Sequence, residues 1–514
     1  MKKIAYIFLL GITLLTTSCS NWLNVLPTDE QVTENYWTSK EDVEAVLASG
    51  YYYMRVTTPY LIDWGELRGF SVYAPTNTAK GKLQNFQMTA ESSLCEWDNF
   101  YKVLNMANSV IKYAPQVQEK DDTYAEGTMN SHLAEAYFMR AWTYFTLVRN
   151  FRDVPLITEP YVDDEESFSV AKSSEDEIIT QIKSDITTAL ASGAAKEYFD
   201  DDDWSGATKG RATKWALYAL MSDVCLWSED YEGCVTYADS IIDATASHRP
   251  AFMTDGSQWF SIFNPGNSNE SIFELNWDYS TYSQTAYSPS NYFLITTSST
   301  YEYSTAMMTR MMEEDAEVEE TGETPVRTEY GAYINLGDDA TPIGVIWKYW
   351  GTELDNLTAV RTYADANYIL YRVADVMLMK AEALIWEGGT SNWQEAVDIM
   401  NQIRERASVP DLDVALSDVS ELDLLNLLLN ERDMELAAEG KRWYDLLRFA
   451  RNDNEKYKSQ FIDKIVSYNT SANSTWLRST LKDEDAWYLP IYYTEIENNK
   501  LLVQNPYYAS TTDE

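Results

Sequence analysis

Two stretches of the sequence combine aromatic side chains with amides and charged groups, and neither keeps a regular period along its length. The stretch from residue 254 to 303 supplies the candidate ligand contacts Trp277, Asp278, Tyr279, Tyr282, Tyr287 and Tyr292. The stretch from residue 59 to 94 supplies Trp64, Arg68, Tyr73 and Asn77. Aromatic rings stack on the flat faces of sugars, while Asn, Asp and Arg bind sugar hydroxyls. Because disordered segments are poor in aromatic residues, we expect both stretches to be ordered and to face a ligand.

Candidates for catalysis are few. The chain has only two histidines, His132 and His248, so it cannot assemble a multi-histidine metal site, and neither lies in a recognisable motif. It has 81 Asp+Glu against 39 Lys+Arg, a net charge of −42. With so many acids, close carboxylate pairs carry no argument for hydrolysis. The negative charge argues against nucleic-acid binding and weakly disfavours polyanionic glycans.

Metal binding and disulfide formation also lack a clear pattern. The run Asp200–Asp203 could hold Ca²⁺, because hard cations take carboxylate oxygens. Consecutive acids point in different directions, however, so a solvated loop is the favoured interpretation, and the same holds for Glu313–Glu320. Cys95, Cys225 and Cys234 are too few for a disulfide framework and resemble buried small apolar residues. We therefore expect no cofactor.

The N-terminus carries a processing signal. Two lysines precede the apolar stretch Ile4–Leu15, which is shorter than the ~20 residues that span a bilayer. Residues 1–18 are therefore predicted to be a signal peptide. The sequence Thr16-Thr17-Ser18-Cys19 resembles a bacterial lipobox, which predicts lipidation of Cys19 and a stable anchor. The usual leucine three residues before the cysteine is absent, and an ordinary secretory signal is the alternative.

Most of the chain is expected to be helical. Only 20 Gly and 14 Pro in 514 residues favour long helices. The apolar period predicts helices at 103–111, ending before Pro115, at 133–148, at 178–190 after a capping box at Ser174–Glu177, and at 422–438. By contrast, the residues from Ser271 to Trp277 alternate like a strand.

Two later segments share one apolar spacing. Tyr231, Cys234, Ala238 and Ile241 have the same offsets as Trp393, Ala396, Met400 and Ile403. Each set follows a helix rich in Ala and Leu, at 215–227 or 373–386. This pattern is typical of tetratricopeptide-like hairpins, and two unrelated amphipathic hairpins are the alternative.

Four blocks of sequence resemble the SusD/RagB family of outer-membrane lipoproteins of Bacteroidetes. They lie at residues 136–156, 368–384, 430–446 and 489–506, and the likeness extends from the signal peptide to the C-terminus. Arg152 replaces a usual glycine, Asp375 a glutamate and Tyr492 a proline. Within the third block, Arg432, Glu435, Glu439 and Arg442 lie within eleven residues, where charges on a helix could pair at i,i+3 and i,i+4. We interpret these residues as framework, with catalysis by their carboxylates as the less favoured alternative.

The resemblance implies a mainly α fold, in which tetratricopeptide-like helical hairpins pack against an irregular, loop-rich ligand-binding region with few short strands. It also implies a single domain at 19–514. Within it we expect a helical framework at about 97–250 and 366–450, ligand-binding tracts at about 59–94 and 254–330, and a C-terminal motif region at 420–514.

The resemblance further implies a role without chemistry. The expected function is to bind a glycan at the cell surface and deliver it to a SusC-like TonB-dependent outer-membrane transporter. The protein would be lipid-anchored and surface-exposed at the outer membrane. The alternatives are a peptide-binding member of the same family, a scaffold for protein interactions built on the helical repeats and, less favoured, a glycoside hydrolase.

Overall fold

The computed structural model describes most of the chain. The described residues are 36–75, 78–161, 169–199, 206–293, 301–319, 325–331, 333–335, 343–353, 356, 358–469 and 472–509. Cys19, Asn77 and the run Asp200–Asp203 lie outside these ranges. One large hydrophobic cluster extends from Trp37 to Tyr508, and two small clusters lie beside it.

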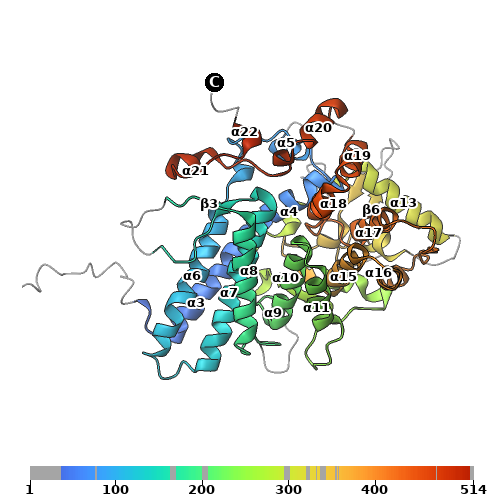
Figure 1. Ribbon diagram of the computed structural model, residues 1–514. Coiled ribbons are helices and arrows are strands. Elements are labelled where there is room, and N and C mark those ends of the chain that lie inside the picture. Colours follow the sequence, from blue (N-terminus) through green and yellow to red (C-terminus); the bar gives the residue numbers. More distant parts are fainter. Residues whose placement is uncertain are drawn as a thin grey trace, which may run out of the picture.

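Four long helices lie side by side in one half of the molecule (Figure 1). They are α3 (Lys40–Val56), α6 (Asp98–Gln118), α7 (Glu126–Phe151) and α8 (Glu175–Ala191). The predicted capping box at Ser174 is present, since its side chain accepts from the Glu177 N–H. The prediction that a helix ends before Pro115 is wrong. Pro115 lies in the last turn of α6, where its missing N–H removes a single helical bond while Val117 stays in the core.

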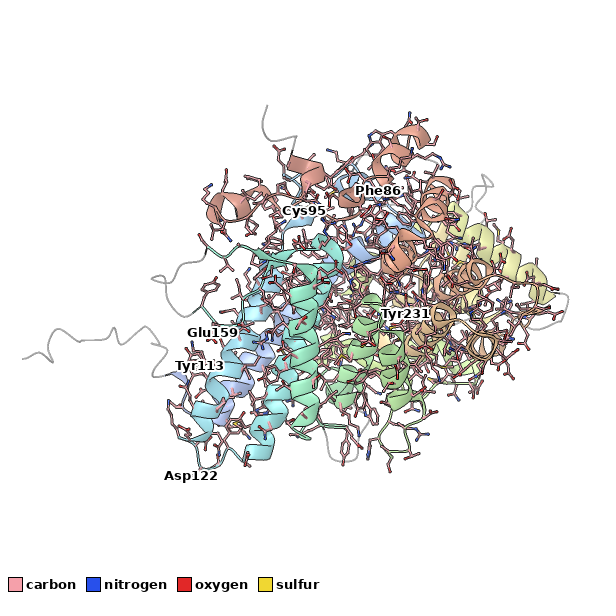
Figure 2. All side chains as sticks on the ribbon, in the orientation of Figure 1. Phe86, Cys95, Tyr113, Asp122, Glu159 and Tyr231 are labelled. Carbon is pink, nitrogen blue, oxygen red and sulfur yellow. The ribbon has the colours of Figure 1, made fainter. Side chains whose placement is uncertain are left out.

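The two predicted hairpins are confirmed. The first is α10 (Lys214–Trp227) with α11 (Tyr231–Ile242), and the second is α15 (Val373–Glu387) with α16 (Thr390–Arg406). Helix α11 of the first hairpin packs on α15 of the second. Tyr231, labelled in Figure 2, stacks on Trp386 of α15 with ring centroids 6.2 Å apart. The shared apolar offsets therefore mark two repeats of one supersecondary unit, and the predicted mainly helical fold is confirmed.

The remaining helices and 3-10 turns are short or lie near the C-terminus. They are α4 (Thr58–Glu66), η2 (Leu67–Gly69), α5 (Ala79–Gln84), η3 (Ser93–Cys95), α9 (Gly206–Lys209), η4 (Gly256–Ile262), α12 (Tyr279–Tyr282), η5 (Pro289–Asn291), α13 (Thr305–Glu319), α14 (Val326–Gly331), η6 (Trp347–Tyr349), α17 (Glu421–Glu435), α18 (Arg442–Glu455), α19 (Lys458–Tyr468), α20 (Ser474–Leu481), η7 (Glu484–Trp487), α21 (Tyr493–Asn498) and α22 (Pro506–Ala509).

Strands are few and short. In the described residues they form a four-stranded sheet in the order β1-β5-β7-β6 and two antiparallel pairs, β2–β3 and β4–β8. Their bounds are β1 (Val72–Tyr73), β2 (Val154–Pro155), β3 (Lys172–Ser173), β4 (Ser271–Leu275), β5 (Glu302–Tyr303), β6 (Tyr333–Asn335), β7 (Ile343–Val345) and β8 (Tyr368–Arg372). The predicted strand at 271–277 is confirmed as β4, and its partner β8 lies about 100 residues later. This pairing holds the middle of the 254–303 stretch beside β8, which leads directly into α15.

A cluster of buried ion pairs joins β8 to α16 and α17. Arg372 and Arg406 both pair with Glu270 and Glu435, and the side chains of all four residues are completely buried. Burial alone would raise the pKa of Glu435, but Arg406, Arg372 and a third arginine, Arg327, hold it at about 2. The Glu435 carboxylate therefore remains ionised inside the protein.

The framework interpretation of the third motif block holds, but its predicted local pairing is wrong. Arg432 pairs with Asp375 and Asp445, and Glu439 pairs with Arg372 and Lys348. The reason is that α17 ends at Glu435 and α18 begins at Arg442, so the block spans a turn and not one helix. These charges connect distant elements instead of neighbouring turns.

Candidate ligand-binding site

A cavity of about 590 Å³ opens between α3 and the loop that follows β4. Its volume falls in the range of roughly 300–1,000 Å³ that is usual for small-molecule sites. The lining residues are Ala48, Tyr51, Tyr52, Arg55, Gly210, Arg211, Asn267, Leu275, Asn276, Trp277, Asp278, Tyr282 and Gln284. We refer to this cavity as the aromatic pocket.

One wall of the aromatic pocket is a single face of α3. Ala48, Tyr51, Tyr52 and Arg55 are spaced by three, one and three residues, which places them on neighbouring turns of the same side. Tyr51 is held in place by two hydrogen bonds. Its hydroxyl donates to Glu135 at 2.7 Å and accepts from the Ala212 N–H at 2.8 Å.

The opposite wall is the loop that leads from β4 into α12. The Trp277 N–H donates to Asn367 Oδ1 at 3.0 Å, and the indole Nε1 donates to the Ala286 carbonyl at 2.7 Å. Asp278 is the N-cap of α12 and accepts from the Thr281 N–H at 2.8 Å. Hydrogen bonds from Thr281 and Ser280 hold the pKa of Asp278 below its usual range, so its carboxylate is ionised at neutral pH. The loop is thus fixed at both ends.

The aromatic residues of the pocket differ in exposure. Tyr282 is 69% exposed and Tyr52 is 48% exposed, whereas Trp277 is 6% exposed and belongs to the core cluster. The two tyrosines therefore offer ring surface to a ligand, and Trp277 forms the floor of the pocket. The open rings and the surrounding amides can contact the apolar and polar faces of a sugar respectively.

Two arginines bring positive charge to the pocket, and they differ in whether a carboxylate pairs with them. Arg211 makes a two-point contact with Glu135, with nitrogen–oxygen distances of 2.6 and 2.9 Å, so its charge is balanced. Arg55 instead donates from Nη1 to the Asn276 carbonyl at 3.1 Å and to Gln284 Oε1 at 2.6 Å. Burial lowers the pKa of Arg55, whereas the Glu135 contact outweighs burial and raises the pKa of Arg211.

The structure brings together part of the candidate set from the 254–303 stretch. Trp277, Asp278 and Tyr282 line the pocket. Tyr279 lies next to them and stacks on Tyr363, with ring centroids 3.4 Å apart. Tyr287 and Tyr292 are not among the lining residues. The first is 36% exposed, and the second is half-buried beneath Lys80.

The expectation that Trp64 and Arg68 contact a ligand is corrected by the structure. Trp64 is completely buried, stacks on Phe100 at 5.1 Å and donates from Nε1 to the Leu94 carbonyl. Arg68 is 2% exposed and donates to the Trp487 carbonyl and to Asn150 Oδ1. Both residues lie on α4 or the η2 turn after it, elements that the core covers.

Tyr73 lines a separate cavity of about 360 Å³ beside β1 and β5. This cavity shares no lining residue with the aromatic pocket. Asn77 lies outside the described residues. The 59–94 stretch therefore contributes nothing to the aromatic pocket within the described part of the chain.

Sequence reasoning missed the contribution of α3. The spacing of Ala48, Tyr51, Tyr52 and Arg55 was a usable signal, because it repeats the period of a helix face and ends on an arginine. Tyr363 carried no such signal. It stacks on Tyr279 only because the β4–β8 pairing brings residues 84 positions apart together.

Both histidines have structural roles. His132 is 4% exposed and shares a 2.8 Å hydrogen bond with the Tyr124 hydroxyl. Burial lowers the pKa of His132 to about 4, so the ring is neutral and its 3.8 Å approach to Glu44 is no ion pair at neutral pH. The ring of His248 lies 3.9 Å from that of Tyr198. Within the described ranges, no group of three metal-ligating side chains occurs.

Fold and cavity together describe a helical-repeat protein with a pocket lined by aromatic and polar side chains. In the described part of the chain, none of the helices has the length and apolar character needed to cross a membrane. The model of the SusD family matches residues 248–508, and a second model, described as starch-binding and associating with the outer membrane, matches residues 21–226. The chain belongs to the SusD family.

Individual relatives support this assignment. SusD-like protein P38 of Formosa agariphila is 29% identical over 497 residues, which cover 87% of this chain and 91% of that protein. A SusD superfamily protein of Bacteroides thetaiotaomicron has a TM-score of 0.70 at 21% identity, covering 92% of this chain and 99% of that one. A laminarin-binding SusD-like protein has a TM-score of 0.63 at 21% identity, covering 91% and 99% of the two chains. The two structural matches show a shared fold.

Proposed function

We propose that this protein binds a glycan in the aromatic pocket and passes it, unchanged, to a SusC-like TonB-dependent transporter. The observation that carries the proposal is the pairing of exposed rings, Tyr52 and Tyr282, with the polar groups of Arg55, Asp278 and Gln284 in one cavity. A family model described as starch-binding and a similar protein described as laminarin-binding support a carbohydrate ligand.

The proposal includes a place in the cell. Removal of residues 1–18 would leave Cys19 as the lipidated N-terminus of a single domain at 19–514, anchored on the surface of the outer membrane. The description of the N-terminal family model as associating with the outer membrane supports this location. The core cluster that extends from Trp37 to Tyr508 supports one domain. Replacing Cys19→Ala should release the protein from the membrane fraction, and a variant that stays bound would contradict the anchor.

A non-catalytic role is supported by the composition of the pocket wall. Glycoside hydrolysis generally uses two carboxyl groups about 5–9.5 Å apart across the scissile bond. Among the described lining residues, Asp278 is the single carboxylate, and it is engaged as the cap of α12. Prolonged incubation with a bound glycan should therefore yield no shorter product, and product formation would support the hydrolase alternative.

Calorimetric titration of the mature chain against plant, host and microbial polysaccharides tests the binding proposal. For the tightest ligand, the double variant Tyr52→Ala/Tyr282→Ala should weaken binding at least about fivefold, because two exposed stacking surfaces are lost. Its thermal midpoint should stay near that of the unmodified protein, since both rings are exposed.

The matched control is Tyr493→Ala, which removes a 43% exposed ring on α21 that does not line the pocket. Equal affinities for the double variant and the control would overturn the assignment of this pocket. Binding of peptides with no binding of polysaccharides would favour the peptide-binding alternative. Co-purification from outer membranes with a TonB-dependent barrel tests the transporter partnership, and purification without one would contradict it.

A further inference from the structure

Arg55 differs from most arginines of this chain in its partners. Arginines elsewhere pair with carboxylates both in the core and at the surface, as Arg372 and Arg478 illustrate. Arg55, Arg68 and Arg249 are the arginines that form no ion pair within the described residues. In a chain with 81 acidic residues, an arginine without an acidic partner is therefore the exception.

Of these three arginines, only Arg55 lines a cavity described above. Arg68 is enclosed in the core, and Arg249 contacts the Ala246 carbonyl outside the aromatic pocket. The guanidinium of Arg55 lies 5.9 Å from the ring centroids of both Tyr52 and Trp277. Two nearby rings and two hydrogen bonds from Nη1 therefore set the position of this group in the pocket wall.

One edge of the Arg55 guanidinium remains open. Both of its protein hydrogen bonds come from Nη1, and no described residue accepts a hydrogen bond from Nε or Nη2. Neither nitrogen is both buried and unpaired, so this edge of the guanidinium is accessible from outside the protein. The Nε–Nη2 edge of a guanidinium matches the two oxygens of a carboxylate, which it binds through two parallel hydrogen bonds.

We infer that Arg55 recognises the carboxylate of an acidic sugar, so that the glycan bound in the aromatic pocket contains uronic acid. This inference rests on the proposed glycan-binding function and specifies its ligand class. The net charge of −42 opposes anionic ligands at long range. At physiological salt, however, exposed charges are screened beyond about 8 Å, so the distant acids oppose a direct contact with Arg55 only weakly. The carboxylate among the described lining residues, Asp278, is engaged as the cap of α12.

Matched pairs of glycans test the inference by calorimetric titration. The probes are oligogalacturonate, oligoalginate and glucuronate-substituted xylo-oligosaccharides, each beside its carboxyl-reduced, neutral counterpart, together with a sulfated galactan oligosaccharide. At least one acidic probe should bind at least about tenfold more tightly than its reduced form. Arg55→Gln should abolish that difference, so that the acidic glycan binds no more tightly than its carboxyl-reduced form.

Two further variants separate recognition from folding. Arg55→Lys keeps the positive charge but cannot form two parallel hydrogen bonds to a carboxylate. It should therefore retain only part of the preference for the acidic glycan. Arg249→Gln removes an arginine that also lacks an ion pair but lies outside the pocket, and it should keep the full preference. Thermal midpoints of all variants show whether each one is folded.

Each outcome supports or overturns a specific statement. Equal binding of acidic and reduced glycans, or a preference that survives Arg55→Gln, overturns the role of Arg55 and leaves glycan binding intact. Tighter binding of the sulfated probe than of every carboxylated one overturns the assignment to a carboxylate. Absence of binding to every glycan, neutral ones included, overturns the proposed function itself.

Discussion

Arg372 in the framework and Arg55 in the aromatic pocket show two uses of the same side chain. Arg372 is completely buried and contacts three carboxylates, those of Glu270, Glu435 and Glu439. Arg55 is partly exposed and contacts only a carbonyl and an amide oxygen. The buried Arg372 has its counter-ions inside the protein, whereas Arg55 in the pocket lacks one. Under the proposed function, this difference separates an arginine that stabilises the fold from one that binds the ligand.

The largest expected effect on stability comes from replacing Arg372, the buried arginine of the framework. Arg372→Met removes one cation from a cluster of three carboxylates and should lower the free energy of unfolding by about 3–5 kcal/mol, because uncompensated buried charge is left behind. Urea unfolding monitored by circular dichroism measures this loss. The control Arg478→Ala breaks an exposed pair with Asp463 and should cost about 0–1 kcal/mol. An unchanged urea midpoint for Arg372→Met would show that the cluster contributes little.

A smaller effect is expected at Trp64, which sequence composition alone grouped with the ligand contacts. Trp64→Phe removes the hydrogen bond to the Leu94 carbonyl and leaves space beside Phe100. The free energy of unfolding should fall by about 1–3 kcal/mol while glycan affinity stays unchanged. Paired unfolding and titration experiments measure both quantities. Weaker glycan binding at unchanged stability would return Trp64 to the binding site.

A pH-dependent effect, small per pH unit, is expected at a buried acid without a cation in contact. Glu66 accepts a hydrogen bond from the Gly440 N–H, and burial raises the pKa of its carboxyl to about 8. The folded protein therefore retains a proton that the unfolded chain loses above its ordinary pKa. Stability should consequently fall as pH rises between about 5 and 8, by at most about 1.4 kcal/mol per pH unit from this group.

Substitution isolates the contribution of Glu66. Glu66→Gln keeps an acceptor for the Gly440 N–H and should flatten the dependence of the urea midpoint on pH across this range. The pKa of Glu435 is depressed to about 2, so its contribution has the opposite sign and is lost only as pH falls from about 4.5 to 2. An unchanged pH profile in Glu66→Gln would show that Glu66 is ionised in the folded protein.

The sequence predicted the helical framework because its signals are local. Tyr231, Cys234, Ala238 and Ile241 all lie on the single helix α11, and the capping box at Ser174 spans four residues. The pairing of the motif charges could not be predicted in this way, since it depends on a turn at residues 436–441 and on partners from distant elements.

The pocket was predicted only in part. Tyr282 and Trp64 are both aromatic residues in stretches without a regular period, yet one is 69% exposed and the other completely buried. Composition cannot separate a ring that stacks on Phe100 in the core from one that faces solvent. The role of Arg55 was hidden for a related reason. Its hydrogen-bond partner Asn276 lies 221 residues away, and a missing counter-ion becomes visible only once the fold has placed the carboxylates.

A crystal structure of the mature chain with its tightest-binding oligosaccharide tests the account most directly. We expect sugar rings in the aromatic pocket, stacked on Tyr52 or Tyr282 and within hydrogen-bonding distance of Arg55. Density for the sugar in the separate cavity beside Tyr73 and Glu302, or elsewhere on the surface, with the aromatic pocket empty, would contradict it.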